Sequence, residues 1–451
     1  MSSATLTPSS TARVRRSLPG GLRGALTPLF PPATEYRRSW RAIALAVVTI
    51  VAGAGLSMTR NGGAGAWNTI WAEDGTNFLT DALNESVLRT VFKPINGYFL
   101  VLPRLLTELT TLFPIEWAAG VMSATAASVG AFLAVLVYTA AGAHVRSWIV
   151  RGLVAAPLIV APVGQGASGP NGGSVINNLA TLQFLLVYAV FWLVLWTPAS
   201  RTGRIVASAV IALTAFSTPL SIVVIPLAAA RLLVRRDLLG WSNLAGLVAG
   251  AALQFGALGL GLTSRSAIGH TRMDPFWILG EYAQWLVPNA VLGEAWNHSG
   301  EVVIVVAAWV VVAAGIALAL TKVTSPRLLL SAVALVVSIG LTAFQIGTLG
   351  AVADRYLYTP GLLVIAALAL LLEPRRPTVA ALAPAVGLAF LLGVVCLANW
   401  QADNHRSHAY SWQSVVAQAR DKCAVGEPKR VTVRTNPALS WRVVFPCRVL
   451  R

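Results

Sequence analysis

Uncharged apolar runs long enough to cross a lipid bilayer recur along this chain, and they constrain its fold more than any other feature. Three examples are Ala42–Met58, Trp117–Ala143 and Leu328–Leu349. About 20 apolar residues in a helix span the ~30 Å hydrocarbon layer of a membrane. Because a spanning segment must satisfy its own backbone hydrogen bonds in lipid, such runs predict helices. The expected fold is therefore an all-α polytopic membrane protein.

The composition agrees with a lipid environment. Charged residues make up only 11% of the chain, less than half the ~25% of soluble domains. The mean hydropathy is +0.69. The formal net charge of +17 comes mainly from cations at the ends of apolar runs and at both termini. This placement indicates that the positive charge serves contact with anionic lipid and follows the positive-inside bias. Binding to nucleic acid is not needed to explain it.

Residues 1–41 precede the first apolar run and are rich in Ser, Thr, Pro and Arg. They are predicted to form a disordered basic arm that stays in the cytoplasm. A cleavable signal peptide would carry its apolar core nearer Met1, so Ala42–Met58 is predicted to be an uncleaved first span.

The apolar runs within residues 42–399 predict about eleven transmembrane helices in the plasma membrane. The count depends on Ile205–Ala230, which we predict to form two short helices that turn at Ser217-Thr218-Pro219. This choice keeps the arginines between residues 231 and 236 in the cytoplasm. An odd number of crossings then places the C-terminal tail, residues 400–451, on the extracytoplasmic side.

The first outer loop, residues 59–116, holds the richest cluster of ionisable groups outside the termini. Thr76–Phe92 repeats apolar residues at helical spacing and carries Asp81, Glu85 and Arg89 on another face. This pattern and the following Phe99–Phe113 predict extracytoplasmic amphipathic helices along the membrane surface.

The tail contains Cys423 and Cys447. In an oxidising compartment these two cysteines are predicted to form a disulfide. The alternating run Val431-Thr432-Val433-Arg434 is predicted to pair as a strand with Trp441–Phe445.

Glu73 and Asp74 are adjacent acids at the start of the first amphipathic stretch. Asp74 suits the N-cap of that stretch, where its carboxylate would accept a backbone N–H. A cap needs only one acid, however, and Arg89 and Lys93 follow in the same loop. The cluster therefore also suits a general base beside an anionic leaving group.

Two other outer segments hold candidate site residues. Asp354-Arg355-Tyr356 lies in a late outer loop, before a span predicted at Gly361–Leu372. Arg355 and Tyr356 suit either a membrane-surface anchor or a phosphate-binding pair. The second large outer loop, Thr263–Glu301, contains His270, but no HExxH-type spacing occurs, so no metal site is predicted.

This layout resembles the GT-C superfamily of polyprenyl-phosphate-sugar-dependent glycosyltransferases. The resemblance rests on the adjacent acids Glu73-Asp74-Gly75 after the first span, two surface helices, an uncharged outer loop after the third span, and Asp354-Arg355-Tyr356-Leu357-Tyr358. It implies that Asp74, or else Glu73, is the catalytic carboxylate, and that Arg355 contacts the lipid-linked phosphate. Further candidates for substrate binding are Tyr356, Arg89, Lys93, Tyr98 and His270.

The function implied is transfer of a hexosyl or pentosyl group from a polyprenyl-phosphate carrier to a cell-envelope glycan, lipid or protein. Members of that superfamily differ in their use of a divalent cation, so no cofactor is assigned and a cation is left open. The alternatives are a lipid or envelope-precursor transporter or flippase, and a non-catalytic assembly partner with the same fold. A transporter would place ionisable residues near the bilayer midplane, whereas here they concentrate in outer loops.

Overall fold

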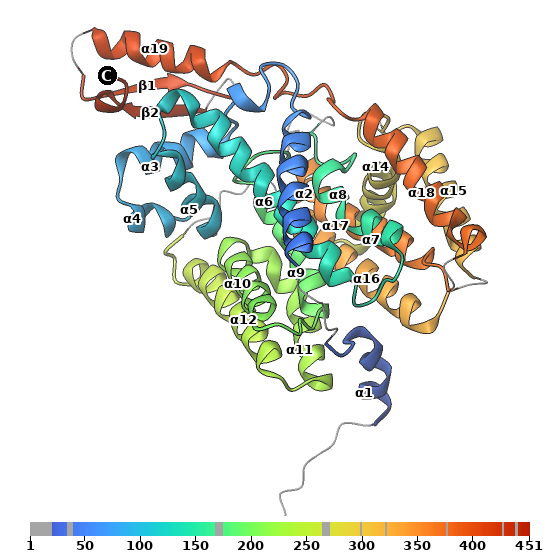
Figure 1. Ribbon diagram of the computed structural model, residues 1–451. Helices are drawn as coiled ribbons and strands as arrows, with labels where there is room; N and C mark the ends of the chain where they lie inside the picture. The colour runs from blue at the N-terminus through green and yellow to red at the C-terminus, as the bar shows by residue number, and fades with distance from the viewer. Residues whose placement is uncertain are drawn as a thin grey trace, which may run out of the picture.

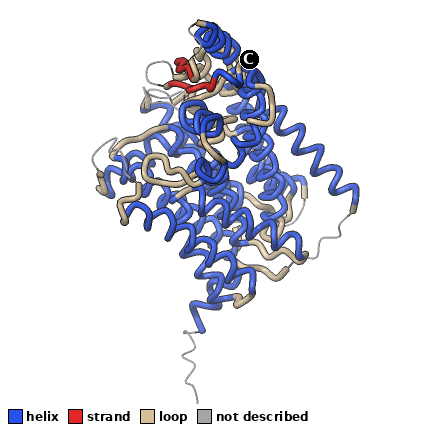
Figure 2. Tube along the Cα trace, turned by 90° about the vertical axis from the view of Figure 1, so that its left-hand side faces the viewer, coloured by secondary structure: helices blue, strands red, loops and turns tan. Residues whose placement is uncertain are grey.

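The computed structural model describes residues 20–33, 39–166, 175–263, 271–297, 300–320, 323–375, 378–425, 428–437 and 441–451. These ranges are mostly helical, with one small sheet at the end of the molecule opposite α1 (Figures 1 and 2). Seven helices among them are long and apolar enough to cross a membrane. They are α2 (Trp40–Met58), α6 (Ala118–Ala141) with the preceding η4 (Ile115–Trp117), α12 (Leu238–Gly259), α15 (Val302–Leu320), α16 (Ser325–Leu349), α17 (Asp354–Leu371) and α18 (Val379–Ala398). The prediction of a helical membrane protein is confirmed.

Shorter helices complete the apolar part of the fold. They are α7 (Trp148–Ala155), α8 (Pro157–Val160), α9 (Leu182–Leu195), α10 (Arg201–Ser217), η5 (Pro219–Val224) and α11 (Ile225–Val234). The turn predicted between α10 and η5 is present. Thr218 is extended there, and its hydroxyl accepts a hydrogen bond from the backbone N–H of Leu220.

The helices α9 and α17 lie at the centre of the molecule. Every residue of α9 is buried, and most of α17 is buried as well. The sequence of α9, LQFLLVYAVFWLVL, is apolar on all sides, which is typical of a helix that other helices surround. By contrast, α2, α15 and α18 leave large apolar side chains exposed, as expected of helices that face lipid.

The helix expected at Thr76–Phe92 is interrupted. The structure has a π-helical turn, η3 (Asp74–Leu79), followed by α3 (Thr80–Asn84), α4 (Val87–Val91) and α5 (Val101–Thr110). Glu85 adopts an extended conformation between α3 and α4. Asp81 is buried, where it accepts hydrogen bonds from Arg104 at 2.9 Å and Lys93 at 2.6 Å. These ion pairs with later residues turn the acidic face inward, so the prediction of one continuous surface helix is wrong.

The second outer loop is also more ordered than predicted. It contains α13 (Pro275–Glu281), η6 (Tyr282–Leu286) and α14 (Val287–Leu292). All of α14 is buried, and the Tyr282 hydroxyl lies 2.9 Å from the Ser338 hydroxyl of α16.

The late outer loop predicted at Asp354-Arg355-Tyr356 is helical as well. The helix α17 begins at Asp354 and continues through Pro360, so Arg355 and Tyr356 lie in its first turn instead of a loop.

Part of the N-terminal arm is folded. Residues 1–19 lie outside the described residues, but Gly20–Leu26 forms α1 and Thr27–Leu29 forms η1. Phe30 is fully buried, and its carbonyl accepts a hydrogen bond from Arg235 Nε at 2.7 Å. The prediction of disorder across residues 1–41 is therefore wrong for this segment, because its apolar end packs under α11 and α16.

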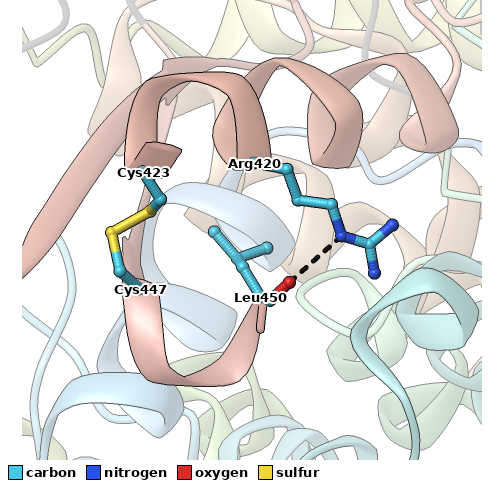
Figure 3. The surroundings of a disulfide bond; sticks show 4 residues. All are labelled: Arg420, Cys423, Cys447 and Leu450. Atoms are coloured by element: carbon cyan, nitrogen blue, oxygen red, sulfur yellow. Dashed lines mark hydrogen bonds between the residues drawn. A yellow bond between two sulfur atoms is a disulfide. The ribbon is translucent and has the colours of Figure 1, made fainter. Parts of the chain in front are cut away.

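The C-terminal tail forms a small subdomain at the end of the molecule opposite α1 (Figure 1). It contains α19 (Trp412–Ala424), the antiparallel strands β1 (Arg430–Arg434) and β2 (Arg442–Pro446), and η7 (Cys447–Val449). Cys423 and Cys447 form the predicted disulfide, with 5.7 Å between their Cα atoms. Figure 3 shows this bond beside the hydrogen bond from Arg420 to the Leu450 carbonyl.

Removing this disulfide is expected to destabilise the tail. The bond closes a loop with a sequence separation of 24, for which chain-entropy estimates give about 3 kcal/mol. We expect Cys423→Ser/Cys447→Ser to lower the melting temperature, whereas Cys396→Ser, which removes the free cysteine of α18, leaves it nearly unchanged. The same cysteines report sidedness. Ready labelling of Cys423 and Cys447 by a maleimide without prior reduction would contradict an oxidised extracytoplasmic tail.

Candidate functional site

The acidic turn at the start of the first outer loop is held in place by the C-terminal tail. Ala72 has a positive φ of 47°, a left-handed conformation that costs a non-glycine residue roughly 1–2 kcal/mol. Its backbone N–H donates to the Asn436 carbonyl at 2.7 Å, and Trp71 forms a bridge with the same residue. Strain of this kind persists only where surrounding contacts enforce it. The tail therefore determines the direction in which the following acids point.

Asp74 is buried and uses both carboxylate oxygens to bind backbone. Oδ2 accepts from the Leu179 N–H and Oδ1 from the Ala180 N–H, each at 2.8 Å. Burial raises the pKa of Asp74 to about 7, while the two backbone donors and the charge of Arg406 act in the opposite direction. Arg406 is itself buried and donates to the Ile176 carbonyl at 2.6 Å.

These contacts change the ranking of the two acids. Asp74 does not cap its own helix, since η3 has no side-chain cap. It instead fixes the chain just before α9, and its side chain is buried, with an exposed fraction of 4%. A general base must be able to reach the proton that it takes from its substrate. The expectation that Asp74 is the base is therefore less well supported than a positioning role.

Glu73 is placed differently. It is only partly buried, and its side chain makes no hydrogen bond to any described residue. Its carboxylate lies close enough to the Arg355 guanidinium and the Tyr98 hydroxyl to act electrostatically on both. Burial raises the pKa of Tyr98 to about 12, and the charge of Glu73 adds to that rise. The phenol of Tyr98 is thus a neutral hydrogen-bond donor near neutral pH.

Arg355, which shares the first turn of α17 with Tyr356, lies within electrostatic range of this carboxylate. Arg355 Nη2 donates to the Tyr356 hydroxyl at 3.2 Å, and its guanidinium carbon lies 5.0 Å from the centre of that ring. The Tyr356 ring in turn packs edge-on against Phe184 of α9, with 6.3 Å between ring centres. The hydroxyl and ring of Tyr356 therefore orient the cation.

The first turn of α9 supports both halves of the site. Gln183 interacts with the Tyr98 hydroxyl and accepts a hydrogen bond from Thr218 Oγ1 at 2.9 Å. Phe184 contacts Tyr356. Because Asp74 binds the backbone immediately before α9, one helix end positions Tyr98, Tyr356 and the acidic turn.

The remaining predicted residues lie elsewhere. Lys93 donates to Asp81 and to Glu85, at 2.6 and 2.7 Å, and Arg89 pairs with Glu85 at 3.3 Å. These cations belong to an ion-pair network within α3 to α5, so their predicted role in substrate binding gains no support. His270 lies outside the described residues.

Four residues that organise the site were missed by sequence analysis. Gln183, Phe184, Arg406 and Asn436 are far from Glu73 in the chain, and none stands in a recognisable motif. Gln183 alone offered a local signal, because it stands in an otherwise apolar run. A buried side-chain amide needs hydrogen-bond partners.

The shift at Asp74 predicts a pH dependence of stability. An unfolded Asp titrates near ~3.9, so the native state holds this proton more tightly. The contribution of Asp74 to the free energy of unfolding is therefore largest below ~pH 4 and falls until the pH reaches about 7. Asn is uncharged at every pH. Raising the pH from 5 to 8 should therefore lower the melting temperature of Asp74→Asn less than that of the wild type. Differential scanning fluorimetry at a series of pH values measures this difference.

A matched control is Asp421→Asn, which removes an exposed acid of α19 and should keep the wild-type profile. Partly buried His144, whose pKa is lowered to about 4 by desolvation, contributes the opposite slope equally to all three proteins. A wild-type profile for Asp74→Asn would contradict the buried, protonatable carboxyl described above.

Comparisons with protein-family models, with curated proteins and with solved structures gave no match to this chain.

Proposed function

We propose that the chain is an integral membrane glycosyltransferase that moves a sugar from a polyprenyl-phosphate carrier to a cell-envelope acceptor on the extracytoplasmic side. One observation carries the proposal. A partly buried carboxylate that accepts no hydrogen bond from the described residues, Glu73, lies within electrostatic range of the guanidinium of Arg355. The two come from segments more than 250 residues apart. A base beside a phosphate-binding cation is what this transfer requires.

The proposed step divides the chemistry between these residues. Glu73 accepts the proton of an acceptor hydroxyl, whose oxygen attacks the anomeric carbon of the donor sugar. The bond from that carbon to the phosphate oxygen breaks, and polyprenyl phosphate leaves. Its added negative charge is stabilised by Arg355, with Tyr98 and Tyr356 as neutral donors nearby.

The segment that follows the acidic turn suits a lipid-linked donor. The helix α4 and the residue after it expose apolar side chains, with Leu88 78% and Phe92 54% accessible. Leu112, two residues beyond the end of α5, is 77% accessible. Apolar side chains beside Arg89 are typical of helices at the level of lipid headgroups, where the phosphate of the donor would lie while its tail remained in lipid.

The topology follows from the same proposal. We count eleven crossings by adding α7–α8, α9, α10 and η5–α11 to the seven long helices. With residues 20–33 in the cytoplasm, this order brings the first outer loop and the tail to the extracytoplasmic side of the plasma membrane. The direct contact between Ala72 and Asn436 supports one side for both.

Purified protein incubated with a radiolabelled polyprenyl-phosphate sugar and an envelope extract tests the proposal. Label should move to the acceptor fraction and polyprenyl phosphate should accumulate in equal amount. Movement of intact donor across a liposome membrane without cleavage would instead identify a flippase. Neither transfer nor movement would favour a non-catalytic assembly partner.

A further inference from the structure

The outward face of the tail hairpin is an arginine surface. In β1 the burial alternates along Arg430, Val431, Thr432, Val433 and Arg434, with the polar residues exposed. Across from it Arg442 of β2 is exposed as well. We call Arg430, Arg434 and Arg442 the hairpin arginines.

Two of these cations stand directly opposite one another. Arg434 and Arg442 are register partners in the antiparallel pair, and like charges at such positions destabilise a hairpin. No described residue forms an ion pair with any of the hairpin arginines. Lys422 of α19 adds a further cation to this surface. Its Nζ donates a hydrogen bond to the Thr432 carbonyl of β1 at 3.0 Å, which places the ammonium group beside the hairpin.

The tail as a whole is positively charged. Residues 400–451 contain nine Lys and Arg residues and three acidic ones. The hairpin arginines lie more than 30 residues beyond the end of α18, whereas the positive-inside bias acts on cations within about 20 residues of a span. Proximity to a span therefore does not account for these cations, whereas attraction of an anionic ligand does.

The hairpin also adjoins the candidate site. The backbone N–H of Arg442 donates to Thr76 Oγ1 at 2.9 Å, and Thr76 lies in η3, the turn that begins at Asp74. The Val444 N–H donates to Thr80 Oγ1 at 3.1 Å. A chain bound along the hairpin arginines would thus pass close to the turn that carries Glu73.

We propose that the hairpin arginines bind an anionic glycan, with carboxylate or phosphate groups along its length, and present it as the acceptor. The role as acceptor rests on the proposed function, whereas the binding itself does not. Outer-leaflet lipid headgroups fit the structure less well. In Figure 1, α4 and α5 lie between the hairpin and the helices α10 and α12, so the exposed apolar side chains of α4 and α5 mark a membrane level below the hairpin.

Binding of the full-length protein in zwitterionic nanodiscs to fluorescent polygalacturonate tests this proposal. Wild-type protein should bind this polyanion, with an affinity that falls as salt is added, and should not bind neutral dextran of equal length. The triple variant Arg430→Gln/Arg434→Gln/Arg442→Gln should bind about tenfold more weakly, as expected for three exposed charge contacts.

The matched control is Arg201→Gln/Arg204→Gln/Arg236→Gln, which removes three exposed arginines at the other end of the molecule and should bind like the wild type. Glu73→Gln should bind normally while losing transfer, so failure of binding and failure of catalysis are distinguishable. Equal polymer binding by wild type and hairpin variant would overturn the proposal. If the hairpin variant lost binding only to vesicles of anionic lipid, the proposal would be overturned too. The hairpin arginines would then bind lipid headgroups instead of a glycan.

Discussion

Replacing Glu73 with Gln is expected to reduce sugar transfer by about 10²–10⁴-fold, the usual contribution of general acid–base catalysis. Gln keeps the size and polarity of the side chain but cannot take the proton from the hydroxyl of the acceptor substrate. Because the side chain of Glu73 makes no hydrogen bond to the described residues, the variant should express and melt like the wild type. Single-turnover rates with a polyprenyl-phosphate sugar measure the effect.

Two variants make this result specific. Glu108→Gln removes another acid of the same outer segment, one whose carboxylate accepts a hydrogen bond from Thr90, and should retain transfer. Asp74→Asn should keep part of the activity, since Asn can still accept one of the two backbone hydrogen bonds. Full activity in Glu73→Gln together with none in Asp74→Asn would restore Asp74 as the base.

Replacing Arg355 with Ala is expected to nearly abolish turnover, and replacing it with Lys should retain a small part. The leaving phosphate gains negative charge as the glycosidic bond breaks, so hydrogen bonds from a guanidinium strengthen in the transition state. Lys keeps the charge but loses the planar pair of donors and the contact with the Tyr356 ring. Steady-state kinetics should show the loss in kcat as well as in kcat/KM.

A membrane-surface anchor predicts another pattern, in which both Arg355 variants are active or both insert poorly. Arg89→Ala is the matched control, because this side chain is 78% exposed and pairs only with Glu85 among the described residues. Wild-type activity in Arg355→Ala would remove Arg355 from the site and leave Arg89 or Lys93 to stabilise the phosphate.

Local sequence determined the membrane class, most helix positions and the small tail. Apolar runs predict helices because lipid leaves the backbone no other partners. The break between α10 and η5 was predictable from Pro219, and the strands β1 and β2 from their alternation. The candidate segments of the site, Glu73-Asp74 and Arg355-Tyr356, also stood out because charge is rare in this chain.

Only the tertiary structure separated the roles of the two adjacent acids. Both are carboxylates before a helix, and nothing in their spacing distinguishes them. The Leu179 and Ala180 backbone N–H groups donate hydrogen bonds to Asp74. Asn436 holds Ala72 in place, and the Glu73 carboxylate lies within electrostatic range of Arg355. The same is true of Lys93, which pairs with Asp81 instead of a substrate. Contacts between distant segments determine which polar group is left without a partner, and that property is invisible in a linear sequence.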